Sequence, residues 1–154
     1  MRRRTSLLFA AVVCLALTVA SPAYAQEPTI VTDITFPEEG APFGTFTATA
    51  PLCPSGTFVD QFVGGGGAFR SGHVDYGAST ILKTFTCTDN SGTFRILFHP
   101  QFSPATSAGC EVAGPFTVGG GTDAYTKLRG HGDFCLLVEG ENFTETFTGT
   151  FTLG

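Results

Sequence analysis

The chain has 154 residues, with 8 lysines and arginines against 13 aspartates and glutamates and a formal net charge of −5. Such an excess of acid repels phosphate backbones and anionic lipid headgroups, so we expect neither nucleic acids nor membrane surfaces as partners. The length suits one domain with a single hydrophobic core.

The N-terminal segment has the three parts of a secretory signal peptide. Three arginines precede an apolar run from Leu7 to Ala20, and small residues lead up to Ala25. We therefore expect cleavage after Ala25 and secretion of a single domain formed by residues 26–154, whose formal charge falls to −8 once the three arginines are lost. Neither the leader nor any later stretch is long enough to predict stable membrane insertion.

Apolar and polar residues alternate with a period of two throughout the expected mature chain, whereas helical spacing is nearly absent. This pattern predicts strands at 29–36, 44–50 and 55–63, then a hairpin over 79–100 with its turn at 89–92. A strand at 114–120 and a last hairpin over 125–153, turning at 139–142, bring the number to about eight. In that hairpin Phe143, Phe147, Phe151 and Leu153 share one face, opposite a row of threonines.

Eight antiparallel strands can close into a barrel, and closure removes the exposed edges that promote aggregation. Gly130 and Gly132 lie on the apolar face of a long predicted strand, where the missing side chains permit the sharp coiling of a small barrel. We therefore expect an all-β fold with a single antiparallel closed barrel. A two-sheet β-sandwich is the alternative, because alternation alone does not separate the two architectures.

Four cysteines remain once Cys14 leaves with the signal peptide. An even number in an exported chain predicts two disulfides. We favour Cys53 with Cys87 and Cys110 with Cys135, because each pair links neighbouring parts of the chain. A zinc site made of four cysteines needs closely spaced pairs, so it is not expected.

Two carboxylates fall on the apolar face of predicted strands. Glu145 lies between Phe143 and Phe147 in the alternating pattern, and Asp60 lies in the same way between two phenylalanines. If this face lines the barrel interior, desolvation raises the pKa of each carboxyl and suits it to act as a general acid or to contact a polar ligand group. We expect instead that both side chains lie at the barrel rim and reach water, with burial in the interior as the alternative.

Metal and cofactor sites are not expected. His73 with Asp75, and His131 with Asp133, each place an imidazole and a carboxylate on one strand face, but they are interpreted as ordinary surface and loop residues. The glycines at 119–121 precede a strand rather than a helix, so they do not predict a phosphate cradle for a nucleotide cofactor.

The segment GPFTVGGGTDAYTKLRGHGDF, followed by ETFTGTFTL, resembles small exported bacterial barrels that are similar to allene oxide cyclase and dirigent proteins. The places of that pattern are held by Gly114, Phe116, Val118, Gly121, Thr122, Tyr125, Leu128, Gly130 and Gly132. CPSGTF and CTDNSGTF look like two further elements of the same proteins. The resemblance implies a barrel and assigns no catalytic residue.

Three functions fit these observations, and the first is a non-enzymatic binding module for a small apolar ligand. The candidate ligand-binding residues are Glu145, Asp60, Tyr125, Phe134 and Phe147. The second is an isomerase or cyclase of the allene oxide cyclase kind, which would need a buried carboxylate together with Tyr125 or Tyr76. The third is a barrel filled by its own side chains, with no ligand.

Overall fold

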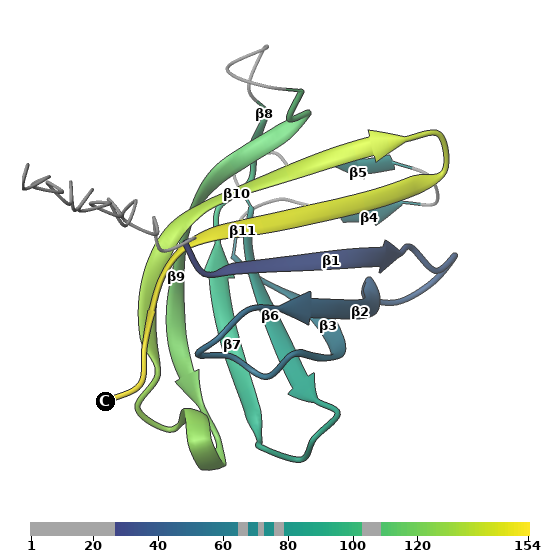
Figure 1. Ribbon diagram of the computed structural model, residues 1–154. Coiled ribbons are helices and arrows are strands. Elements are labelled where there is room, and N and C mark those ends of the chain that lie inside the picture. The colour runs from purple at the N-terminus through teal and green to yellow at the C-terminus, as the bar shows by residue number, and fades with distance from the viewer. Residues whose placement is uncertain (1–26, 65–67, 71–72, 76–78, 103–108) are drawn as a thin grey trace, which may run out of the picture.

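The chain folds into a closed antiparallel β-barrel. The computed structural model describes residues 27–64, 68–70, 73–75, 79–102 and 109–154, and only the backbone for 68–70, 73–75 and 102. The strands follow one another around the barrel in the order β10-β11-β1-β2-β3-β6-β7-β9, and β9 pairs with β10 to close it (Figure 1). The predicted barrel of eight strands is therefore confirmed over the sandwich.

The strands lie close to the predicted positions. The barrel consists of β1 (Thr29–Thr35), β2 (Phe43–Ala48), β3 (Ser55–Gly64), β6 (Thr80–Cys87), β7 (Thr93–Phe98), β9 (Val112–Gly121), β10 (Arg129–Glu139) and β11 (Asn142–Thr152). Short additions are β4 (Ala68–Arg70), β5 (His73–Asp75), β8 (Gln101–Phe102) and a 3-10 helix, η1 (Asp123–Tyr125). β4 pairs with β5, so the glycine-rich connection expected as a loop contains a small hairpin.

Leu153 differs from the sequence prediction, and the predicted signal peptide is not described by the structure. Leu153 was expected on the inner face but is 49% exposed, because β11 ends at Thr152 and no longer directs it inward. The predicted signal peptide, residues 1–25, lies outside the described residues. In the part of the chain that the structure describes, no helix is long and apolar enough to cross a membrane.

Both predicted disulfides are present and confirm the favoured pairing. Cys53 and Cys87 are joined with their Cα atoms 6.0 Å apart, and Cys110 and Cys135 with theirs 5.3 Å apart. The first bond ties the β2–β3 connection to the end of β6, and the second ties the chain just before β9 to β10. Two disulfides are compatible with an extracellular protein.

The barrel core is built largely of phenylalanine, because every second residue of each strand points inward. Phe147 lies in its middle, with its ring centroid 5.4 Å from Phe98, 5.6 Å from Phe116 and 5.8 Å from Phe134. The side chains of Phe134 and Phe147 are 2% and 0% exposed. This part of the interior is therefore packed with aromatic rings.

Glycine lets β10 and β11 approach each other closely. A Cβ atom on Gly132 would collide with the carbonyl oxygen of Thr148 and come within 2.8 Å of the Phe116 ring. Gly132 pairs directly with Gly149 on β11. Glycine is therefore needed on the inner face of β10 because the backbone of β11 lies too close for a side chain, and not for flexibility alone.

The two ends of the barrel differ. One end, the plugged end, carries the β2–β3 connection, the β6–β7 turn and η1, and it is closed by buried side chains of Leu52, Tyr125 and Leu128. The other end carries the β1–β2 connection and the β10–β11 turn, which lie together on the right of Figure 1. We call it the acidic end because exposed glutamates gather there: Glu38, Glu39, Glu139 and Glu141.

Candidate functional site

Three charged side chains meet inside the barrel and form what we call the charged cluster: Asp60, Lys83 and Glu145. They come from β3, β6 and β11, and their exposed fractions are 4%, 0% and 2%. Each occupies an inward position of the alternating pattern, between apolar residues two positions away on either side. The two predicted carboxylates therefore lie in the interior, not in water at the rim.

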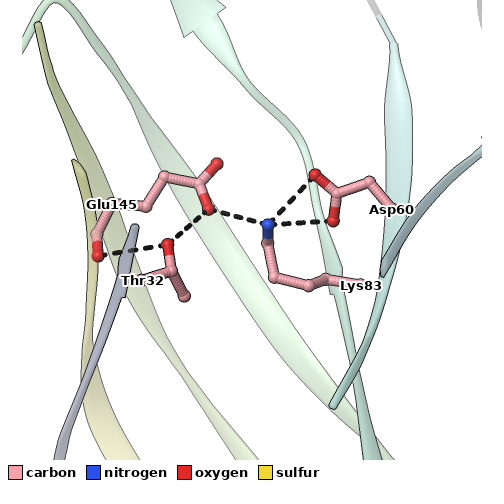
Figure 2. A network of polar contacts seen from close by, with 4 residues as sticks. All are labelled: Thr32, Asp60, Lys83 and Glu145. Carbon is pink, nitrogen blue, oxygen red and sulfur yellow. Dashed lines mark hydrogen bonds and ion pairs between the residues drawn. The ribbon is translucent and has the colours of Figure 1, made fainter. Parts of the chain in front are cut away.

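Lys83 holds the charged cluster together (Figure 2). Its Nζ atom lies 2.8 Å from Oδ1 and 3.0 Å from Oδ2 of Asp60, and 2.9 Å from Oε2 of Glu145. Asp60 and Lys83 face each other directly in the β3–β6 register, whereas Glu145 reaches the same ammonium group from β11. On the Glu145 side the hydroxyl of Thr32, itself fully buried, donates to Oε2 at 3.1 Å.

Aromatic rings surround the cation. The Phe58 ring centroid lies 3.6 Å from the Lys83 Nζ atom, and that of Phe98 lies 5.7 Å away. A ring face attracts a cation, and the attraction is stronger where water is excluded. The charged cluster is therefore embedded in the phenylalanine core rather than separated from it.

Burial raises the pKa of Asp60 from 3.8 to about 7. Loss of hydration is the largest cause; the Lys83 charge acts in the opposite direction, and the nearby Glu145 carboxylate raises the pKa further. A carboxyl of this kind gains and loses its proton near neutral pH. Perturbed carboxyls beside a specific charged partner are frequent at functional sites, so this cluster is the leading candidate site.

The charged cluster lies toward the acidic end of the barrel. Beyond Glu145 the next inward residue is Phe143, beyond Thr32 it is Ile34, and beyond Asp60 it is Phe62. Two residues of strand span about 7 Å. Phe62 and Phe143 are only partly buried, so one layer of apolar side chains separates the cluster from this end.

One hollow opens at the same end, and a second lies along the outer faces of β1, β2 and β3. The first, of about 400 Å³, is lined by Ile34, Thr35, Phe36, Glu141, Asn142 and Phe143. The second, of about 650 Å³, is lined by Asp33, Ile34, Thr35, Phe43, Gly44, Thr45, Thr57, Phe58 and Asn142. Both volumes fall in the range of small-molecule sites.

The structure brings together some of the predicted site residues and separates one. Glu145 and Asp60 share Lys83, and Phe147 and Phe134 pack on Phe98, whose ring also faces that lysine.

Tyr125 lies at the plugged end instead. Its ring packs against Phe94 with centroids 5.3 Å apart, and its hydroxyl lies 3.3 Å from Ser91 Oγ. None of its described polar or ring contacts is with the charged cluster. Tyr76 lies outside the described residues.

The residues considered for metal binding do not form a site among the side chains that the structure describes. His131 and Asp133 are exposed on the outer face of β10, and His131 Nδ1 lies 3.3 Å from the hydroxyl of Thr150. The side chains of His73 and Asp75 lie outside the described part. Cys53, Cys87 and Asp89 come close together, but both sulfurs are bonded to each other and offer no thiolate.

Sequence reasoning missed Lys83, although the signal was present. Lys83 stands between Ile81 and Phe85 in the alternating pattern of β6, the same arrangement that singled out Glu145 and Asp60. A buried lysine needs an acidic partner. Three inward-facing charges of opposite sign in one small barrel therefore point to a shared cluster.

No protein-family model, no curated protein and no solved structure matches this chain. The resemblance to allene oxide cyclase and dirigent-like barrels therefore stays a prediction.

Proposed function

We propose that this protein is an exported, non-enzymatic binding module for a small, mainly apolar molecule. The observation that carries the proposal is the charged cluster, a set of costly buried charges one residue layer below a hollow at the acidic end. Apolar surface binds the body of a ligand, and a few buried polar groups fix its orientation. Asp60 and Glu145 would have the orienting role.

The apolar part of the proposed site is the rim at the acidic end. Phe36 and Phe143 meet edge to face with centroids 4.6 Å apart, and both line the smaller hollow. Neither ring is fully buried, so a ligand that covers them removes apolar area from water. The predicted signal peptide and the two disulfides support action outside the cell.

The proposal is tested by binding of N-phenyl-1-naphthylamine, a neutral apolar dye whose fluorescence rises in an apolar site. We expect saturable binding by the mature protein and at least fivefold weaker binding by Phe143→Ala, because this substitution removes part of the hollow's apolar wall. Leu153→Ala is the matched control, since it trims an exposed apolar side chain at the other end of β11. Absence of dye binding, or equal loss in both variants, would leave the ligand-free barrel as the better account.

An isomerase or cyclase is the second candidate, favoured by the raised pKa of Asp60 beside a lysine. Tyr125 does not support it, because that side chain packs at the plugged end. Native mass spectrometry of protein purified from its own host would reveal a co-purifying molecule. Conversion of that molecule by wild type but not by Asp60→Asn would favour the enzyme over the binding module.

A further inference from the structure

The charged cluster carries more negative than positive charge. Asp60 and Glu145 share the single ammonium group of Lys83, so the fully ionised cluster has a formal charge of −1. No other charged side chain is buried in the part of the chain whose side chains are described. An unbalanced buried charge is costly, and a ligand that brings a positive charge removes that cost.

One carboxylate oxygen of the cluster is free to accept a further hydrogen bond. Oδ1 of Asp60 lies 2.8 Å from Lys83 Nζ, close enough for an ion pair, but it has no aligned hydrogen bond. The aligned bond from Lys83 goes to Oδ2 at 3.0 Å. A buried oxygen of this kind favours a ligand group that donates an N–H or O–H bond.

The outer charges at the acidic end have the same sign as the cluster. Glu38 and Glu39 stand on the β1–β2 connection, and Glu139 and Glu141 on the β10–β11 turn. Lys127 and Arg129 lie near the plugged end, beside η1. This distribution attracts cations to the hollow at the acidic end and repels anions from it.

We propose that the ligand is a cationic amine, an apolar molecule whose protonated amino group enters at the acidic end and binds to the charged cluster at Oδ1 of Asp60. The inference rests on the proposed binding function and names its ligand class. The apolar body would lie against Phe36 and Phe143, and the amino group would reach about one residue layer deeper.

Three molecules of matched size test the ligand class: 4-phenylbutylamine, 4-phenylbutanol and 4-phenylbutanoic acid. Each is measured by displacement of N-phenyl-1-naphthylamine from the mature protein at about pH 8 and low salt. We expect the amine to displace the dye at a concentration at least tenfold lower than the alcohol, and the acid to be the weakest. The preference should shrink at high salt, because the surface glutamates are then screened.

The charged cluster itself is tested by substitution. Asp60→Asn and Glu145→Gln keep the side-chain shape but remove one negative charge each, so each should reduce the preference for amine over alcohol about tenfold. Glu139→Gln removes a charge at the surface of the same end and should change it no more than about twofold. Circular dichroism checks that the variants remain folded.

Wild-type protein gives a test that needs no variant. Amine binding should weaken as the pH falls from about 8 to about 5.5, since Asp60 takes up a proton and no longer attracts a cation. The groups facing Asp60 in this range are Lys83 from β6 and Glu145 from β11, with the neutral Thr32 hydroxyl beside Glu145. The amine stays protonated throughout, so the change belongs to the protein.

The possible results separate the two proposals. If the dye itself does not bind, the binding function fails and the ligand class fails with it. If the dye binds but the alcohol or the acid displaces it as well as the amine does, the amine inference is wrong and the binding function stands. If the amine preference survives in both Asp60→Asn and Glu145→Gln, the cation does not bind at the charged cluster and the inference is overturned.

Discussion

Lys83 forms ion pairs with two buried carboxylates, and this pairing explains how charged side chains persist in a core of phenylalanine. Taking an ion out of water is costly, and the ion pairs at 2.8 and 2.9 Å recover part of that cost. The ion pairs offset the cost of burial only while the lysine and the carboxylates are all present. Removing the lysine alone should therefore destabilise the fold more than replacing all three charged residues together.

Substitution Lys83→Met should lower the free energy of unfolding by about 3–5 kcal/mol near neutral pH, because it leaves two buried carboxylates without a cation. Urea unfolding followed by circular dichroism measures the change. The loss should be smaller near pH 4, because Asp60 is then protonated and carries no charge.

The matched comparison is a triple variant, Asp60→Leu with Lys83→Met and Glu145→Met. It replaces the charged cluster by apolar side chains of similar size, so it should be at least as stable as wild type. If the triple variant is stable and no longer binds the amine, the cluster serves ligand binding rather than folding. A triple variant as unstable as Lys83→Met would show that the cluster is needed for the fold.

Asp60 should make stability fall as the pH rises. Its pKa is about 7 in the folded protein against 3.8 as the ordinary value, so the folded state holds a proton that the unfolded state has lost. The stabilisation from that proton is fully present below about pH 4 and is lost as the pH rises through about 7. Urea midpoints between these pH values should therefore decline less steeply in Asp60→Asn than in wild type.

Asp133→Asn is the control for this pH dependence, because Asp133 is exposed on the outer face of β10. It should leave the wild-type slope unchanged. Equal slopes in wild type and Asp60→Asn would contradict the raised pKa.

At the residue scale, alternation placed Asp60 and Glu145 on the inner face but left open whether they reach water. Their shared contact with Lys83 could not be predicted, because Glu145 comes from β11, which is separated from β3 by β1 and β2 in the barrel. Whether side chains from distant strands meet across the interior depends on how the barrel closes and how its strands tilt. The alternation of polar and apolar residues predicts neither. Asp60 and Lys83, direct partners on neighbouring strands, were within reach of sequence reasoning.

At the element scale, the strands were the most predictable part of the molecule. Threonine and phenylalanine alternate along β11, and its partner β10 shows the same two faces. The β6–β7 turn was also predictable: Asn90 and Gly92 have φ angles of 60° and 125°, and Asp89 accepts bonds from both the backbone and the hydroxyl of Ser91. The β4–β5 hairpin was missed, since each strand has only three residues and their pattern is too short to read.

Gly132→Ala tests the close approach of β10 to β11. The added Cβ atom meets backbone atoms of Thr148 and Gly149, which cannot move away as a flexible side chain can. We expect a loss of about 3 kcal/mol or more, measured by thermal unfolding, or failure to fold.

Gly119→Ala provides the comparison. Gly119 lies on β9 with only the Arg95 carbonyl oxygen near a new Cβ atom, at 3.9 Å, so alanine should be tolerated there. Equal losses at both glycines would mean that strand flexibility, rather than close contact, explains the need for Gly132.

At the scale of the whole molecule, the sequence predicted a barrel because eight strands and inward glycines favour closure. It did not predict that the two ends would differ in charge and in packing. That difference depends on which connections meet at each end, and so on the circular order of the strands. The position of Tyr125 has the same origin: η1 carries it to the plugged end, away from the carboxylates with which it was grouped.

The uneven placement of lysine has a practical consequence for studying this protein. The sequence contains two lysines, Lys83 and Lys127; the first is fully buried and the second is exposed near the plugged end. Reagents that modify primary amines should therefore attach there, or at the chain terminus that leads into β1. A sensor chip or fluorophore coupled in this way would leave the opposite mouth of the barrel facing the solution, ready for ligand screening.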